Sequence, residues 1–110
     1  MVSALLIASS WARRKLSADG VVVVVIIVDS QTGELVGGPD VVNRGFVHEE
    51  TSGDILEEAR VRVMQSVKES AEANVTDPSA LQQNVRRVLK RYFNEVTQRK
   101  PVILPVIMEA

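Results

Sequence analysis

The chain has 110 residues, a length that suits one domain with a single hydrophobic core. Apolar residues make up 45% and the net charge at pH 7 is −1, which is typical of a globular domain and excludes disorder and a global attraction to nucleic acid. The lack of cysteine excludes disulfides and thiolate metal sites, and a single histidine excludes a multi-histidine metal cluster within this chain.

The first segment, residues 1–15, is expected to be an extension or a linker that precedes the domain at 16–110. Its short apolar run, Ala4 to Ala8, is followed by the positive charges of 13–15. A secretory signal carries its positive charge before the apolar run, so we expect no secretion signal and favour a terminal strand. Ser17 to Gly20 then turns the chain into the next element.

The most distinctive stretch is Val21 to Val28, eight β-branched apolar residues in a row. Branching at Cβ disfavours helix and suits a pleated strand, and eight residues are too few to span a bilayer as a helix. A half-buried strand alternates apolar and polar residues, whereas this one is apolar throughout, so we expect both of its faces to be covered.

A hairpin is expected after this strand. The polar stretch 29–33 ends in glycine, and 34–36 starts the return. The cluster at 37–40, Gly-Gly-Pro-Asp, is typical of a bulge or kink, and 41–47 is expected to resume as a second strand antiparallel to the first.

A helical period begins at Asp54, where Asp54 and Glu57 resemble a capping pair, and should continue to about Asn74. The residues expected on its apolar stripe are Leu56, Ala59, Val63, Val67 and Ala71, with Ile55 and Met64 beside them.

A second helix should start at Asp77, which caps it, with Pro78 at the first helical position. We expect Arg99 and Lys100 in its last turn and Pro101 to end it. Its apolar face comprises Leu81, Val85, Val88, Leu89, Tyr92 and Val96.

The final strand is expected at Val102 to Met108, and Pro105 within it indicates an edge position or a bulge, because proline cannot donate to the ladder. The predicted fold is α+β: a small three-stranded mixed β-sheet with two antiparallel helices packed on one face, in the order β-β-α-α-β.

Catalytic chemistry finds no support in the sequence. His48 stands beside Glu49 and Glu50 without a second histidine, and we expect a surface histidine at a strand end. The acidic pair Glu57–Glu58 is expected to be solvated rather than an acid/base pair, since adjacent helical residues do not face each other. The glycines form no phosphate loop. We predict no catalytic residue, no metal ligand and no cofactor for this chain.

The two predicted helices carry opposite charge. From Glu49 to Ala73 there are seven acids and three bases, and from Leu81 to Lys100 six bases and one acid. One interpretation is mutual attraction and solubility; the other is that the basic helix lies near a polyanion. The residues proposed to face that polyanion are Arg86, Arg87, Lys90 and Arg91.

Three separated motifs resemble one known family. They are Leu-Ser-Ala-Asp-Gly at 16–20 before a valine-rich strand, Gly-Pro-Asp-Val-Val-Asn-Arg-Gly-Phe-Val at 38–47, and Thr-Gln-Arg-Lys-Pro-Val-Ile-Leu-Pro-Val-Ile-Met-Glu at 97–109. Together they resemble the C-terminal domain of bacterial ribonuclease J, over roughly Trp11 to Ala110.

The resemblance implies a cytoplasmic location and a part in RNA maturation and decay. Ribonuclease J is a 5′-to-3′ exonuclease and endonuclease whose metallo-β-lactamase and β-CASP domains hold zinc and the catalytic ligands. Those motifs are absent here, so no catalytic residue carries over, and zinc is expected only in the catalytic domains. The family's C-terminal domain is an accessory module implicated in oligomerisation. Contact of this chain with RNA is expected to be weak or indirect, and membrane contact is not expected.

Self-association through the sheet is expected because two helices can cover only one face of it. The open set is either Val21, Val23, Val25 and Ile27 or Val22, Val24, Ile26 and Val28, and we choose the second set as the self-association surface. The alternative function is a free-standing, dimeric α+β regulatory or small-ligand-binding domain of another class, which would need a pocket.

Overall fold

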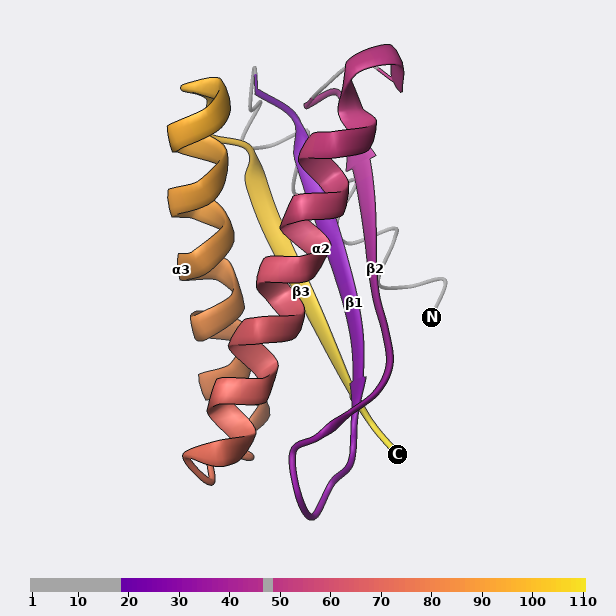
Figure 1. Cartoon of the computed structure of the whole chain (residues 1–110), viewed down its shortest axis with the longest axis vertical. Helices are drawn as coiled ribbons and strands as arrows, with labels where there is room; N and C mark the ends of the chain where they lie inside the picture. The colour runs from indigo at the N-terminus through magenta and orange to yellow at the C-terminus, as the bar shows by residue number, and fades with distance from the viewer. Residues whose placement is uncertain (1–18, 47–48) are drawn as a thin grey trace.

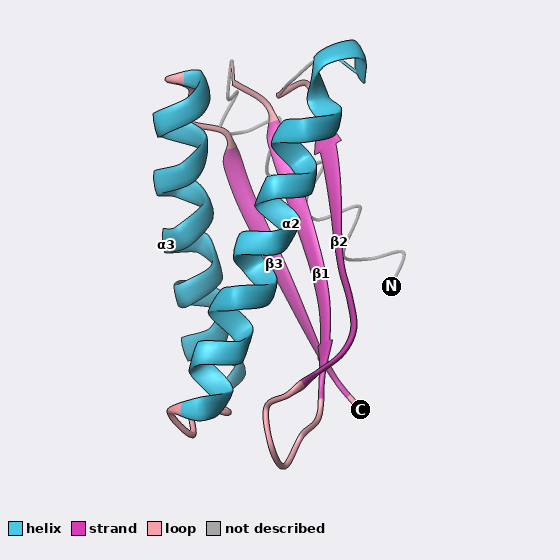
Figure 2. Ribbon diagram, viewed as in Figure 1, coloured by secondary structure: helices cyan, strands magenta, loops and turns pink. Residues whose placement is uncertain are grey.

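The structure, a computed structural model, describes residues 19–46 and 49–110 as a two-layer α+β domain (Figure 1). Both helices pack on the same face of the sheet and run antiparallel to each other, which confirms the predicted class and order (Figure 2). The elements are β1 (Val21–Val28), β2 (Leu35–Arg44), α2 (Glu49–Glu72), α3 (Pro78–Thr97) and β3 (Val102–Glu109).

The sheet is mixed, with strand order β2-β1-β3, so the all-apolar strand β1 lies in the centre. It pairs antiparallel with β2, where Val23 lies opposite Val42, and parallel with β3, where Val23 lies opposite Leu104. The parallel pairing is possible because the two helices carry the chain from one edge of the sheet to the other. Pro105 lies on an edge strand, as predicted.

The core lies between the sheet and the helices, and alternate residues of β1 form its floor. Phe46, at the end of β2, meets Phe93 of α3 edge-on with ring centroids 4.6 Å apart, and neither side chain is exposed. The buried core residues are Val22, Val24, Ile26, Val28, Phe46, Ala59, Val63, Val67, Leu81, Val85, Leu89, Tyr92, Phe93 and Ile103.

The choice of Val22, Val24, Ile26 and Val28 as the self-association surface was therefore wrong. All four are at most 2% exposed and belong to the core beneath the helices. Because side chains alternate along a strand, the other set, Val21, Val23, Val25 and Ile27, points to the opposite face of the sheet. The sequence could not distinguish the two sets, since both are apolar and β-branched.

Strand β2 differs from the two-part strand that was expected. It runs without interruption from Leu35 to Arg44, and the predicted irregularity appears instead as shifts in register opposite Ile27. Gly38 has a φ of +79° there, and a Cβ on it would lie 2.6 Å from the carbonyl oxygen of Val25. The bulge at 37–40 is thus confirmed. Residue 47 and the histidine at 48 lie outside the described residues.

Helix boundaries correct the sequence analysis at three ends. α2 begins at Glu49, so Asp54 lies inside the helix rather than capping it, and ends at Glu72. α3 begins as predicted, because the Asp77 carboxylate accepts a hydrogen bond from the backbone N–H of Ala80 at 3.3 Å. It ends at Thr97, since Gln98 adopts a left-handed conformation with φ of 57°, and the next two residues lie beyond the helix.

Two residues assigned to the apolar faces of the helices are exposed: Met64 is 40% exposed and Val96 is 50% exposed. No helix in 49–110 has the length and apolar character needed to cross a membrane.

At one end of the sheet, Asp19 joins segments that are distant in sequence. Its carboxylate accepts hydrogen bonds from the backbone N–H of Lys100 at 2.8 Å and from Nε of Arg99 at 3.3 Å. Arg99 also donates to the carbonyl oxygen of Phe46. Gly20 follows with a φ of +87°, and a Cβ on it would lie 2.4 Å from the carbonyl carbon of Gly45. The start of β1, the end of β2 and the turn after α3 are thereby held together.

Candidate functional site

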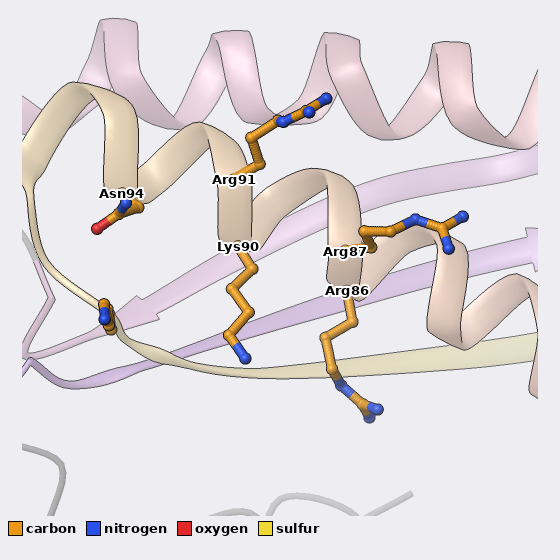
Figure 3. A pocket seen from close by; sticks show the side chains of 6 residues that line it. Arg86, Arg87, Lys90, Arg91 and Asn94 are labelled. Atoms are coloured by element: carbon orange, nitrogen blue, oxygen red, sulfur yellow. The ribbon is translucent and has the colours of Figure 1, made fainter.

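The four basic residues singled out in the sequence lie together on α3. Arg86, Arg87, Lys90 and Arg91 line a recess of about 600 Å³ (Figure 3). Asn94 and Lys100 complete the lining. The sequence analysis missed these two, because it placed Lys100 inside the helix and gave no weight to a neutral asparagine. We call these six residues the basic recess.

The cations of the basic recess form two rows. Arg86 and Lys90 are four residues apart and lie about one helical turn from each other on the same side of α3. Figure 3 shows both side chains extending from α3 toward β3, whereas Arg91 projects from α3 in the direction of α2. Arg87 and Arg91 form the second row, rotated by about 100° around the helix.

Hydrogen bonds connect the first row to the edge of the sheet. Nε of Arg86 donates to the carbonyl oxygen of Ile103 at 3.5 Å, and Nε2 of Gln82 donates to that of Pro105 at 3.4 Å. These carbonyls belong to β3, an edge strand whose unpaired groups would otherwise invite another strand. Because Pro105 also lacks an N–H, this edge is poorly suited to strand addition.

The second row is connected to the other helix. Nη2 of Arg87 donates to Oδ1 of Asn84 at 2.7 Å, and Nδ2 of Asn84 donates to Oγ of Ser70 on α2 at 3.2 Å. One guanidinium nitrogen of Arg87 is thus already engaged within the domain.

Ion pairing between the helices is not what joins them in the described part of the chain. The ion pairs of α2, Arg60 with Glu57 and Arg62 with Glu58, lie within that helix at 3.8 Å. Besides the bond between Asn84 and Ser70, the Tyr92 hydroxyl of α3 donates to the carbonyl oxygen of Ile55 on α2 at 3.1 Å. Burial raises the pKa of Tyr92, and the guanidinium of Arg62 lies 4.6 Å from its ring centroid.

The sheet face opposite the helices is the second candidate surface, which we call the outer sheet face. Val21 and Val23 are 7% exposed, while Val25 and Ile27 are half-buried. Residues paired directly across the strands share this face. They add Val102, Leu104, Val106 and Met108 from β3, which are all half-buried, and Asp40, Val42 and Arg44 from β2, which are all exposed.

A second recess, of about 810 Å³, lies between the hairpin loop and α2. Leu35, Val61 and Met64 give it an apolar wall, and Lys68 and Glu72 contribute opposite charges. The sequence analysis did not predict this recess: it assigned no role to Val61 and placed Met64 beside the apolar stripe, whereas both side chains are exposed.

Metal ligation finds no support among the side chains that the structure describes, which contain no group of three histidines, cysteines or carboxylates able to hold an ion.

Comparison with known proteins bears on these surfaces. Residues 12–110 match the family described as the ribonuclease J C-terminal domain. The chain is 41% identical over 97 residues to ribonuclease J2 of Bacillus subtilis, and 33% identical over 97 residues to the ribonuclease J 2 proteins of Staphylococcus epidermidis and Staphylococcus aureus. Each match covers 88% of this chain but only 17–18% of the relative, so the chain spans less than a fifth of their length.

The family match decides between the two kinds of domain that the sequence left open. A domain of another class is set aside, because the match extends over nearly the whole chain. The chain belongs to the ribonuclease J C-terminal domain family.

Proposed function

We propose that this chain is a non-catalytic accessory domain that assembles ribonuclease J subunits through the outer sheet face. In this proposal the exonuclease and endonuclease activity, and the zinc, reside in catalytic domains outside this chain, and the enzyme acts in the cytoplasm. The single observation that carries the proposal is the composition of the outer sheet face. All the residues that β1 and β3 contribute to it are apolar: Val21, Val23, Val25, Ile27, Val102, Leu104, Val106 and Met108.

The magnitude of apolar burial supports association. If each subunit hides about 300 Å² of apolar surface, two subunits gain about 15 kcal/mol at about 25 cal/mol per Å². Association costs roughly 4–15 kcal/mol in lost freedom of motion, so burial of this size is sufficient to offset that cost.

The charges at the rim of the outer sheet face suit a second copy of this chain. Asp40 and Arg44 lie opposite Val25 and Val21 and are exposed. A two-fold axis brings the same patch of each subunit together, so each copy offers both an acid and a base to its partner.

A matched pair of substitutions in the intact enzyme tests this function. Val106→Lys places a charge on the outer sheet face, whereas Val96→Lys places the same charge at a 50% exposed site on α3. We expect Val106→Lys to reduce the mass of the assembly measured by light scattering, and Val96→Lys to leave it unchanged. An assembly of normal mass in both variants would contradict the proposal.

A weak contribution to RNA affinity is part of the same proposed accessory role. The candidates for this contact are Arg86, Arg87, Lys90 and Arg91, which share the basic recess. Phosphate contacts carry no sequence information, so this contribution is expected to be independent of base sequence.

A further inference from the structure

We propose that one row of the basic recess, Arg86, Lys90 and Lys100, binds successive phosphates of a single-stranded nucleic acid along the edge of β3. This inference rests on the weak RNA contact proposed above and assigns it to one of the two rows. The sequence could not distinguish Arg87 and Arg91 from the other cations, and we expect these two residues not to contact the phosphates.

The geometry of the first row is linear. Arg86 and Lys90 are separated by about 6 Å of helical rise, and both side chains extend from α3 toward β3 (Figure 3). Lys100 lines the same recess from the turn between α3 and β3, and so extends the row beyond the helix. Three cations spread along one side of the domain suit a polymer with repeated negative charges better than a compact anion.

The donors of this row are available. Arg86 uses Nε on the Ile103 carbonyl, which fixes the plane of the guanidinium and leaves its two Nη groups for a phosphate. Lys90 and Lys100 are exposed, and none of the carboxylates described in 19–46 and 53–110 forms an ion pair with either ammonium group.

The second row is less suitable for two reasons. Arg87 already donates to Asn84 through Nη2, and Arg91 projects in the direction of α2. The sequence from Glu49 to Ala73 has seven acids against three bases, so a phosphate approaching on that side meets repulsion. The β3 side of α3 lies away from those carboxylates.

We do not expect the row of Arg86, Lys90 and Lys100 to recognise bases. Tyr92 and Phe93, the aromatic residues of α3, are buried in the core, so the recess has no ring on which a base can stack. Single-stranded RNA and DNA of equal length should therefore bind alike, since both present the same phosphodiester charge.

The test measures binding of a fluorescein-labelled 12-nucleotide RNA of mixed sequence to the purified chain by anisotropy, over a series of salt concentrations. Three phosphate contacts on a single strand predict a slope of log affinity against log salt of about −2. Replacing Arg86 and Lys90 by glutamine should reduce the slope by about 1.4. The matched control, Arg87→Gln with Arg91→Gln, removes the same charge and should leave the slope within about 0.3 of the parent value.

Because Arg86→Gln also removes a hydrogen bond to β3, a second variant, Lys90→Gln with Lys100→Gln, retains that bond and should weaken binding equally. The assignment would be overturned if the variant without Arg87 and Arg91 lost as much affinity as the variant without Arg86 and Lys90. It would also be overturned if the parent chain bound no RNA at low salt. If polyglutamate bound as tightly as RNA of equal charge, the proposal that the ligand is a nucleic acid would be contradicted. Light scattering on the same samples reports self-association independently, so failure here does not imply failure of the proposed assembly role.

Discussion

Asp19 stabilises the fold in a way that depends on pH. The backbone N–H of Lys100, and then the side chain of Arg99, hold the pKa of the Asp19 carboxyl below its usual value of 3.8. A carboxyl whose pKa is lower in the folded state contributes stability above the unfolded pKa and loses it as the pH falls through the folded value. The contribution of Asp19 should therefore be complete at neutral pH and fade below about pH 4.

We predict that Asp19→Asn lowers the melting temperature at pH 7 and makes the loss of stability below pH 4 less steep. The neutral amide still accepts one hydrogen bond but no longer attracts the guanidinium of Arg99. Melting curves recorded by circular dichroism from pH 7 to pH 2 measure this. Parallel pH profiles for the parent and the variant would show that Asp19 makes no such contribution.

At the scale of the element, α3 shows which features a sequence determines locally. Its start was predictable, because an aspartate followed by proline satisfies the free N–H groups of the first turn. Its end was not, because the left-handed Gln98 is followed by Arg99 and Lys100, whose contacts with Asp19 join residues some 80 positions apart. Long-range contacts of this kind leave no local pattern in the sequence.

The sequence could not predict which face of β1 meets the helices. Strand identity followed from eight β-branched residues, but the side that meets the helices depends on the register with β2 and β3. The uniform run contains no polar residue to mark it. The four basic residues were predicted as a group because they are close in sequence, whereas their division into two rows depends on where β3 lies.

We predict that Asp77→Ala destabilises the domain by about 1 kcal/mol, the usual value for loss of an N-cap. The carboxylate of Asp77 accepts a hydrogen bond from the backbone N–H of Ala80 at 3.3 Å. Urea denaturation measures the change. Ser79→Ala, at an exposed position in the same first turn, is the control and should cost less than about 0.5 kcal/mol. Equal costs would show that the cap is unimportant.

At the scale of the whole molecule, the two faces of the sheet differ in what they contact within the domain. One face, with Val22 and Val24, forms the core with the helices, and the other presents an apolar layer of its own. The basic recess lies on α3, apart from the outer sheet face. This separation lets the proposed assembly role and the proposed phosphate contacts be tested by substitutions that do not interfere with each other.

We predict that the isolated chain binds no structural zinc and cleaves no RNA. It has one histidine and no cysteine, and the described side chains contain no metal-binding cluster. Metal analysis after dialysis, together with a labelled-RNA cleavage assay, measures both properties. Stoichiometric zinc, or cleavage that disappears when a residue of this chain is replaced, would contradict the prediction.

Self-association of the purified chain tests the central proposal most directly. We predict that light scattering at about 100 μM shows a dimer for the parent chain and for Val96→Lys, and a soluble monomer for Val106→Lys, because an interface of about 300 Å² per subunit does not tolerate a buried unpaired ammonium. A parent chain that is monomeric at this concentration would contradict the account, since the outer sheet face would then need no second copy to cover it.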